Sequence, residues 1–232
     1  MPLLTPFETE ALLLSLKVAV TAVACSLPFA VAVAWLLARK EFPGKSVFNA
    51  LVHLPLVVPP VVIGYLLLVT LGRKGILGAW LDETFGIVIA FTWMAAAVAS
   101  GVMAFPLMVR AIRLSIEAVD ARLESVARTL GASHARVLMS VTLPLTLPGI
   151  VAGVALAFAR CLGEFGATIT FASNIPGVSR TLPLALYTAL NMPGGEANAL
   201  RLVLLSVVLA FVSLAISELM ARRVARLITG IG

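Results

Sequence analysis

Charged side chains are scarce in this sequence. Asp, Glu, Lys and Arg make up 12% of its 232 residues, whereas globular domains average about 25%. Hydrophobic residues make up 61% of the chain, and apolar runs of roughly 20 residues, each long enough to cross a hydrocarbon layer about 30 Å thick, recur along it. A soluble globular domain is thereby excluded. The sequence predicts a single all-α integral membrane domain over residues 1–232.

Cysteine and histidine are rare as well. Cys25 and Cys161 each lie inside an apolar run, which favours free buried thiols over a disulfide, and no metal-ligand spacing is present. His53 and His134 have no partner in the neighbouring sequence for acid–base or metal chemistry. We therefore expect no metal, no cofactor and no enzymatic activity. The net charge of +6 does not indicate nucleic acid, because the basic residues cluster at the ends of apolar runs, facing membrane lipid headgroups.

Five of the apolar runs are interpreted as membrane spans. They cover about 10–38, 48–72, 86–109, 144–170 and 201–221. A further run at 181–190 has only ten residues, bounded by Pro183 and a Pro-Gly-Gly turn, and is too short to cross. We expect it to form a short helix at the outer face.

The distribution of Lys and Arg predicts the orientation of these spans. Three basic residues lie in 39–45, five in 110–136 and three in 222–226, including Arg222 and Arg226, whereas the opposite connections carry four. Cytoplasmic connections are the ones enriched in Lys and Arg. The N-terminus is therefore predicted to lie outside and the C-terminus inside.

The second span is interrupted by prolines. Pro55, Pro59 and Pro60 each lack a backbone donor, which predicts a kink or an unwound turn. The freed carbonyls must then find partners on neighbouring helices or in a wet cavity. Two interpretations stay open: a structural bend at a subunit contact, and a bend beside the translocation pathway that flexes between gated states.

The connection at about 114–143 is the most informative segment. From Val119, apolar residues recur with helical spacing through Leu123, Val126, Ala127 and Leu130, and the opposite face is polar. Gly131 is suited to end this helix, and Ser133 is a plausible N-cap for a second helix from His134 to about Val141. We expect Leu143-Pro144 to halt the second helix and start the next span. The pattern predicts two short helices at an angle.

This connection resembles the conserved loop of ABC-importer permeases, written EAA, three residues, G, nine residues, I-x-L-P. Gly131 is followed by nine residues and then Val141-Thr142-Leu143-Pro144; Ser125-Val126-Ala127 occupies the EAA triplet, with Glu124 one place early. The resemblance implies a type I ABC importer permease fold whose coupling helices dock on a cytoplasmic ATPase subunit. The residues it assigns to docking are Glu124, Ser125, Ala127, Arg128, Gly131, Ala132, Leu143 and Pro144. An interfacial amphipathic helix is the alternative interpretation.

Two charged residues lie within the fourth span. Arg160 and Glu164 are four residues apart, so they share one face of a helix and can pair. Charges at membrane depth are candidates for function by default. One interpretation is an internal ion pair that fixes packing. The other is a pathway face on which Arg160, Thr168 and Thr170 meet an anion; Pro59 and Pro60 are further pathway candidates.

The string R-x-L-G-E-F-G-A-T at 160–168, together with HLPLVVPPVVIGYLLL, FPLMVRAIR and ARTLGA, closely resembles bacterial molybdate-transporter permeases. That resemblance implies a homodimer in the inner membrane with one pathway at its twofold interface. It also implies two ATPase subunits beneath the dimer and a periplasmic binding protein for molybdate or another oxyanion. The sequence contains no G-x-x-x-x-G-K-[ST] phosphate loop, so ATP hydrolysis must reside in a separate subunit.

Other functions stay open. Sulfate, thiosulfate and tungstate permeases share parts of the same pattern, so the transported oxyanion rests on resemblance alone. A secondary transporter or channel that needs no nucleotide is a further alternative. It is disfavoured because no inverted repeat is visible and Glu164 is the only acid deep within a span, which leaves little for proton or sodium coupling.

Overall fold

The structure, a computed structural model, describes the backbone of residues 4–229 and the side chains of that range except those of residues 134, 217–218, 221–222 and 224–229. Its described residues form helices and no strands. Four helices are long and apolar enough to cross a membrane, and one bent pair brings the number of candidate spans to five. The prediction of an all-α protein with about five spans is confirmed. The side chains of Arg222 and Arg226, which entered the orientation argument, lie outside the described residues.

The first span is helix α1 (Pro6–Arg39), which contains the predicted range 10–38. It starts at a capping box, in which the Thr5 hydroxyl accepts from the Glu8 amide and the Glu8 carboxylate accepts from the Thr5 amide. Such reciprocal bonds satisfy two of the free N–H groups of a helix start. The buried Glu8 carboxylate also lies 2.9 Å from Arg201 on α11 (Glu196–Thr229), so an ion pair joins the first and last helices.

Helix α5 (Trp93–Glu117) is the centre of the bundle, packed against α1 and α8 (Leu143–Leu162). Its first half is rich in buried alanine, serine and glycine, and such small residues let neighbouring helices approach closely. The predicted span 86–109 began too early. The Thr92 hydroxyl accepts from the Met94 amide and caps the helix there, while the preceding Ile-Val-Ile stretch, β-branched and weakly helical, stays irregular.

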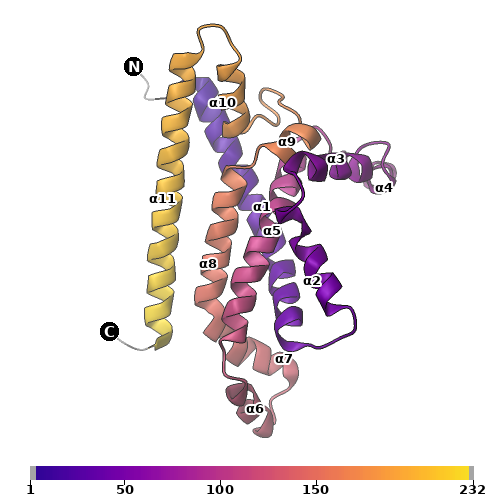
Figure 1. The fold of residues 1–232 in the computed structure, drawn as a ribbon, viewed down its shortest axis with the longest axis vertical. Coiled ribbons are helices and arrows are strands. Elements are labelled where there is room, and N and C mark those ends of the chain that lie inside the picture. Colours follow the sequence, from indigo (N-terminus) through magenta and orange to yellow (C-terminus); the bar gives the residue numbers. More distant parts are fainter. Residues whose placement is uncertain (1–3, 230–232) are drawn as a thin grey trace.

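The second predicted span, 48–72, is not one straight helix. Helix α2 (Lys45–His53) continues into the 3₁₀ turn Leu54–Leu56, and α3 (Pro60–Leu71) then departs at 107°. The expected proline break is confirmed, and it is sharper than a kink. The sequence predicts an outer loop at 73–85, but the structure has helix α4 (Ile76–Phe85) there. In Figure 1, α3 and α4 project to one side of the bundle.

The fourth predicted span, 144–170, differs at both ends. The backbone is helical without a break from α7 (His134–Val137) through a π-helical turn (Leu138–Thr142) into α8. Leu143-Pro144 therefore does not halt a helix: Pro144 follows directly on the π-helical turn, where the regular i→i−4 hydrogen bonding is already interrupted. Helix α8 ends at Leu162, and residues 163–165 separate it from the short helix α9 (Gly166–Phe171).

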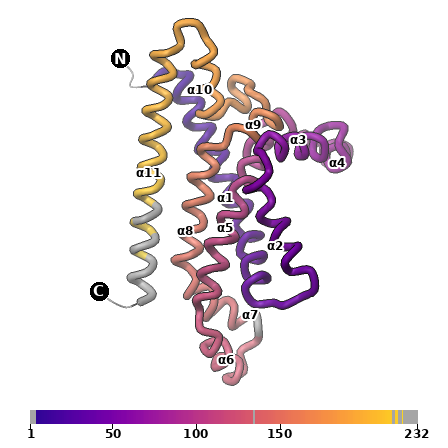
Figure 2. Tube along the Cα trace, viewed as in Figure 1, coloured from indigo at the N-terminus to yellow at the C-terminus, as the bar shows by residue number. Residues whose placement is uncertain are grey.

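The two ends of the bundle carry different connections. The expected short helix at 181–190 is present as α10 (Leu182–Leu190). Figure 1 places α10 and the N-terminus at one end, and α6 (Ala121–Thr129), α7 and the end of α11 at the other. The connection between α1 and α2 lies at the same end as α6 (Figure 2). The two described connections richest in Lys and Arg therefore share one end, as the charge distribution requires for a single membrane side.

Candidate functional site

The α6 helix has a defined start and stop. The Asp120 carboxylate accepts from the Arg122 amide at 2.8 Å and caps the first turn. At the other end, the Gly131 amide donates to the Arg128 carbonyl and the Ala132 amide to the Ala127 carbonyl, the bond pair of a Schellman motif. Gly131 has φ +86°, the left-handed conformation that glycine adopts without strain. The predicted stop at Gly131 is confirmed, and the helix starts at Ala121.

The apolar stripe of α6 faces outward. Leu123, Val126 and Leu130 are 50%, 56% and 83% exposed. Together with Ala127 they line a shallow hollow of about 370 Å³ whose other wall is the start of the fourth span, with Val141, Pro144 and Leu145. Apolar side chains that the fold leaves uncovered beside a hollow indicate a surface for a partner.

Of the predicted docking residues, Glu124 faces inward. Its side chain is 14% exposed, and its Oε1 atom lies 3.0 Å from Arg39 Nη2 at the end of α1. The Thr142 hydroxyl, in the π-helical turn, donates to the same oxygen at 2.8 Å. Arg39 also donates to the Val119 carbonyl at 3.0 Å. We call Arg39, Glu124 and Thr142 the brace, because they join α1, α6 and the start of the fourth span.

The other predicted docking residues make local contacts. Ser125 donates to the Ala121 carbonyl, and the Arg128 guanidinium donates to the Glu124 carbonyl and the Ser125 hydroxyl. Leu143 and Pro144 form the half-buried first turn of α8. Sequence reasoning missed Arg39 and Thr142, because Arg39 is remote from Glu124 in the chain and no spacing connects them. The only sequence signal was a basic residue at the end of a span that shares its membrane side with α6.

Within the membrane-spanning part, Arg160 and Glu164 form the ion pair that their spacing allows. Arg160 Nη1 lies 2.6 Å from Glu164 Oε2, with 28% and 1% of the two side chains exposed. The other carboxylate oxygen of Glu164 accepts from the Ala167 amide at 2.8 Å. Glu164 thus holds the end of α8 and the start of α9 together.

The remaining pathway candidates lie where α9 meets α3. Thr168 and Thr170 are on α9, separated from α8 by the break at 163–165, so they do not continue the helical face of Arg160. Thr170 donates to the Gly166 carbonyl. The Thr168 hydroxyl is fully buried and has no hydrogen-bond partner among the described residues.

Close backbone contact joins α3 to α9. Pro59 is the N-cap of α3 and Pro60 its first residue. A Cβ added at Gly166 would meet the Pro60 Cβ at 2.8 Å, and one added at Gly64 would meet the Ala167 carbonyl oxygen at 2.6 Å. Both glycines therefore allow an approach that a side chain would prevent. The structure brings Pro60 and α9 together, and Glu164 anchors the start of α9.

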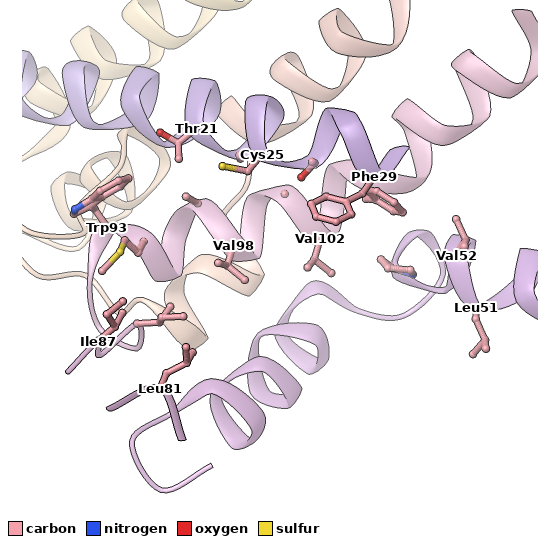
Figure 3. A pocket seen from close by; sticks show the side chains of 18 residues that line it. Thr21, Cys25, Phe29, Leu51, Val52, Leu81, Ile87, Trp93, Val98 and Val102 are labelled. Atoms are coloured by element: carbon pink, nitrogen blue, oxygen red, sulfur yellow. The ribbon is translucent and has the colours of Figure 1, made fainter. Parts of the chain in front are cut away.

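A larger hollow of about 840 Å³ lies between α1, α5 and the α2 to α4 segment. Figure 3 shows its walls, with Cys25 and Phe29 from α1 and Trp93 from α5 among the labelled side chains. The lining is almost wholly apolar, apart from the hydroxyls of Thr21 and Ser26 and the Cys25 thiol. An oxyanion would leave water there without enough donors to replace its hydration. This hollow is not suited to hold an anion.

Comparison with known proteins points in one direction. Residues 26–226 match the family described as binding-protein-dependent transport system inner membrane component. The chain is 60% identical to the molybdenum transport system permease protein ModB of Escherichia coli K12, over 95% of this chain and 96% of the relative. It is 55% identical to ModB of Haemophilus influenzae, over 93% and 94%. The sulfate transport system permease protein CysT of Escherichia coli K12 is 35% identical, over 84% and 72%.

Solved structures share the fold. A chain of a bacterial ABC transporter that imports the acidic polysaccharide alginate superposes with a TM-score of 0.73 at 15% identity, over 95% of this chain and 80% of that chain. A chain of the MetNI methionine ABC transporter in an inward-facing conformation superposes with a TM-score of 0.68 at 16% identity, over 94% of both chains. At such low identity, the likeness shows the architecture and not the cargo.

Proposed function

This chain belongs to the family of binding-protein-dependent transport system inner membrane components, and from that membership we propose that it is the transmembrane subunit of an ATP-driven importer for molybdate. The observation that supports this proposal most strongly is the sequence identity to molybdenum permeases across almost the whole chain. In this proposal the N-terminus lies outside, α6 and α7 lie in the cytoplasm, and a periplasmic binding protein delivers the oxyanion.

The energy source is a separate subunit. The sequence has no phosphate loop, which ATPases of this kind need to hold the nucleotide phosphates. We assign the exposed stripe Leu123, Val126 and Leu130 to the contact with that ATPase, with Ser125, Arg128 and the Gly131-Ala132 turn at its edge. An amphipathic helix seated in a partner's groove is a common mode of recognition.

The brace gives the docked helix its mechanical effect. Because Glu124 is bonded to both α1 and the π-helical turn, a displacement of α6 is transmitted to two membrane helices at once. Packed elements shift between discrete arrangements more readily than they stretch. Glu124 therefore acts by positioning α6, whereas the apolar stripe makes the contact.

We assign the translocation pathway to the twofold axis of a homodimer, as the resemblance to molybdate permeases implies. The Arg160–Glu164 pair takes the packing role, since the carboxylate is buried and both of its oxygens are engaged. A neutralised arginine is a poor trap for an anion, and a conduit must release its cargo. The bend at Pro59 and Pro60, pressed against α9, is assigned to the moving wall of the pathway.

Sulfate is the second candidate cargo, because the chain also resembles a sulfate permease at 35% identity. Cells that lack their own molybdate permease and carry this chain with its ATPase and binding protein should regain uptake of radiolabelled molybdate. Excess tungstate or sulfate is added in parallel. Uptake blocked by a small excess of sulfate would assign sulfate as the cargo, and absence of any rescue would contradict the proposal.

A further inference from the structure

A small polar pocket lies beside the brace, at the end of α1 that carries Arg39. It has a volume of about 270 Å³ and is enclosed by α1, α6 and the start of the fourth span. Arg39, Lys40 and Arg128 supply three cationic side chains to its wall, against the single carboxylate of Glu124. Trp35 completes the α1 side. The lining therefore carries an excess of positive charge.

The cations of this pocket are only partly satisfied. Arg39 spends its Nη2 atom on Glu124 and the Val119 carbonyl, but its Nε atom is buried and has no hydrogen-bond partner among the described residues. Lys40 and Arg128 are exposed, and neither forms an ion pair with a described side chain. A buried donor without a partner calls for an acceptor that the protein itself does not supply.

The depth of the pocket matches the membrane surface. Helix α1 has 34 residues, so it is about 51 Å long at about 1.5 Å per residue. A bilayer with its headgroups is about 40–45 Å thick, so a helix of this length that crosses it ends at or just beyond the headgroups. The Lys40 ammonium lies 5.6 Å from the centre of the Trp35 ring. Tryptophan beside a basic residue is typical of the interface between the hydrocarbon layer and water.

We propose that this pocket binds a tetrahedral oxyanion carried by a phosphate or similar group. The group is either the headgroup phosphate of an anionic phospholipid in the leaflet beside α6, or a free oxyanion in solution on that side. Basic pockets between membrane helices bind anionic headgroups in this way. The ligand would accept from the part of the Arg39 guanidinium that lines the pocket, and from Lys40 and Arg128 at the rim. Because Lys40 follows α1 and Arg128 belongs to α6, it would bridge the two elements that the brace joins. The binding site itself does not depend on the proposed function. Only the identification of the leaflet beside α6 as the cytoplasmic one rests on that function.

The test is ligand binding by the full-length purified protein in neutral detergent. The probes are phosphatidylglycerol, phosphatidylcholine, inorganic phosphate and molybdate, and the readouts are titrated binding and the shift in unfolding temperature. The pocket variant is Lys40→Gln/Arg128→Gln. The control variant, Lys45→Gln/Arg122→Gln, also removes one Lys and one Arg charge from the same end of the molecule, but outside the pocket. All four positions have side chains at the surface or pairs with exposed partners, so both variants are expected to fold.

The proposal predicts that phosphatidylglycerol, or one of the free oxyanions, binds the wild-type and control proteins alike. Its affinity for the pocket variant should fall roughly tenfold or more, as expected when two favourable charges are lost. Response to phosphatidylglycerol alone identifies the lipid as the source, and response to phosphate or molybdate identifies the free anion. Equal loss in both variants would show diffuse attraction to a basic surface and overturn the site. So would the absence of any anion-specific binding. Neither result bears on molybdate uptake, which the cell assay measures separately.

Discussion

Glu164 engages a different group with each of its two carboxylate oxygens. One oxygen lies 2.6 Å from the Arg160 guanidinium, and the other accepts from the Ala167 amide at 2.8 Å. With 1% of its side chain exposed, the carboxylate is shielded from bulk solvent, which could otherwise replace a lost partner. Removal of one member of such a buried pair leaves an uncompensated charge, which is far more destabilising than the loss of the pair as a whole.

We expect Arg160→Gln to destabilise the protein by about 3 kcal/mol or more, because Glu164 then stays buried and unpaired. The double variant Arg160→Gln/Glu164→Gln should recover at least half of that loss, since glutamine still offers an oxygen to the Ala167 amide. Thermal unfolding in detergent measures both. Arg73→Gln, which breaks an ion pair whose side chains are 72% and 38% exposed, serves as control and should have little effect. A double variant less stable than Arg160→Gln would contradict the assignment.

The spacing of Arg160 and Glu164 was enough to predict their pairing, because residues four apart on one helix are neighbours. The second bond of Glu164 was not predictable in the same way. It depends on α8 ending at Leu162 and α9 starting at Gly166, whereas the sequence through 170 is apolar apart from this pair and a few small or hydroxyl residues, and is interpreted as one helix. Local composition indicates where a helix is possible, and tertiary contacts decide where it breaks.

At the scale of helices, α3 packs against α9 directly after the bend of the second span. This contact depends on glycine, because a Cβ at Gly166 would lie 2.8 Å from the Pro60 Cβ, while the nearest atom to a Cβ at Gly163 is 4.0 Å away. These two glycines, three positions apart in the chain, are a matched pair for substitution.

Gly166→Ala should lower stability by about 1–3 kcal/mol, the usual range for overpacking, and should reduce molybdate uptake because α9 is displaced from α3. Gly163→Ala should be close to wild type in both. The measurements are the unfolding temperature and initial uptake rates at equal expression. If the two variants behaved alike, the close contact would not matter for either property.

The brace is a second contact between helices, because it joins α1, α6 and the π-helical turn. Thr142→Val keeps the shape of the side chain but removes the donor to Glu124, and Glu124→Gln removes the charge that pairs with Arg39. A hydrogen bond to a charged group contributes about 1.5–3 kcal/mol. We expect both variants to retain bound ATPase but to transport fewer molybdate ions per ATP hydrolysed.

The control for the brace is Glu117→Gln, which makes the same carboxylate-to-amide change at an ion pair within one helix. Its transport per ATP should equal that of wild type. A brace variant that loses the ATPase altogether would show that Glu124 contributes to docking itself, and not to the position of α6.

The exposed stripe of α6 leads to a separate expectation. Leu123→Asp and Val126→Asp place a charge on a face that we expect a partner to cover, and a buried unpaired charge opposes binding. Each should reduce the amount of ATPase recovered with the purified permease at least tenfold. Arg122→Ala, on the polar face of α6, should not. Full recovery of ATPase with both aspartate variants would place the docking surface elsewhere.

Across the whole molecule, the number of membrane-crossing segments and the end that carries the basic connections were predictable from the sequence, because both follow from hydropathy and from the Lys and Arg counts. The 107° bend after Leu56 was predictable as a break but not in its angle, since neighbouring helices set the direction of α3. Helix α4 was missed because ten residues bounded by glycines were interpreted as a loop. The brace was missed because its residues, remote from one another in the sequence, meet only at one end of the folded bundle.

The described helices expose a large apolar surface, above all on α11 and α3, which is suited to contact with lipid or with other membrane helices. The chain consists of membrane helices and the two short helices α6 and α7 at one end of them. Its sequence contains no phosphate loop that could bind a nucleotide. In the proposed function, its role as a gate depends on work done by another subunit and transmitted through α6.

Reconstitution into sealed vesicles tests that dependence most directly. Accumulation of molybdate against its gradient is measured for the permease with its binding protein, with and without the ATPase and with and without ATP. The account predicts accumulation only when ATPase and ATP are both present on the side that α6 faces. Uphill accumulation by vesicles that contain the permease without the ATPase would contradict it.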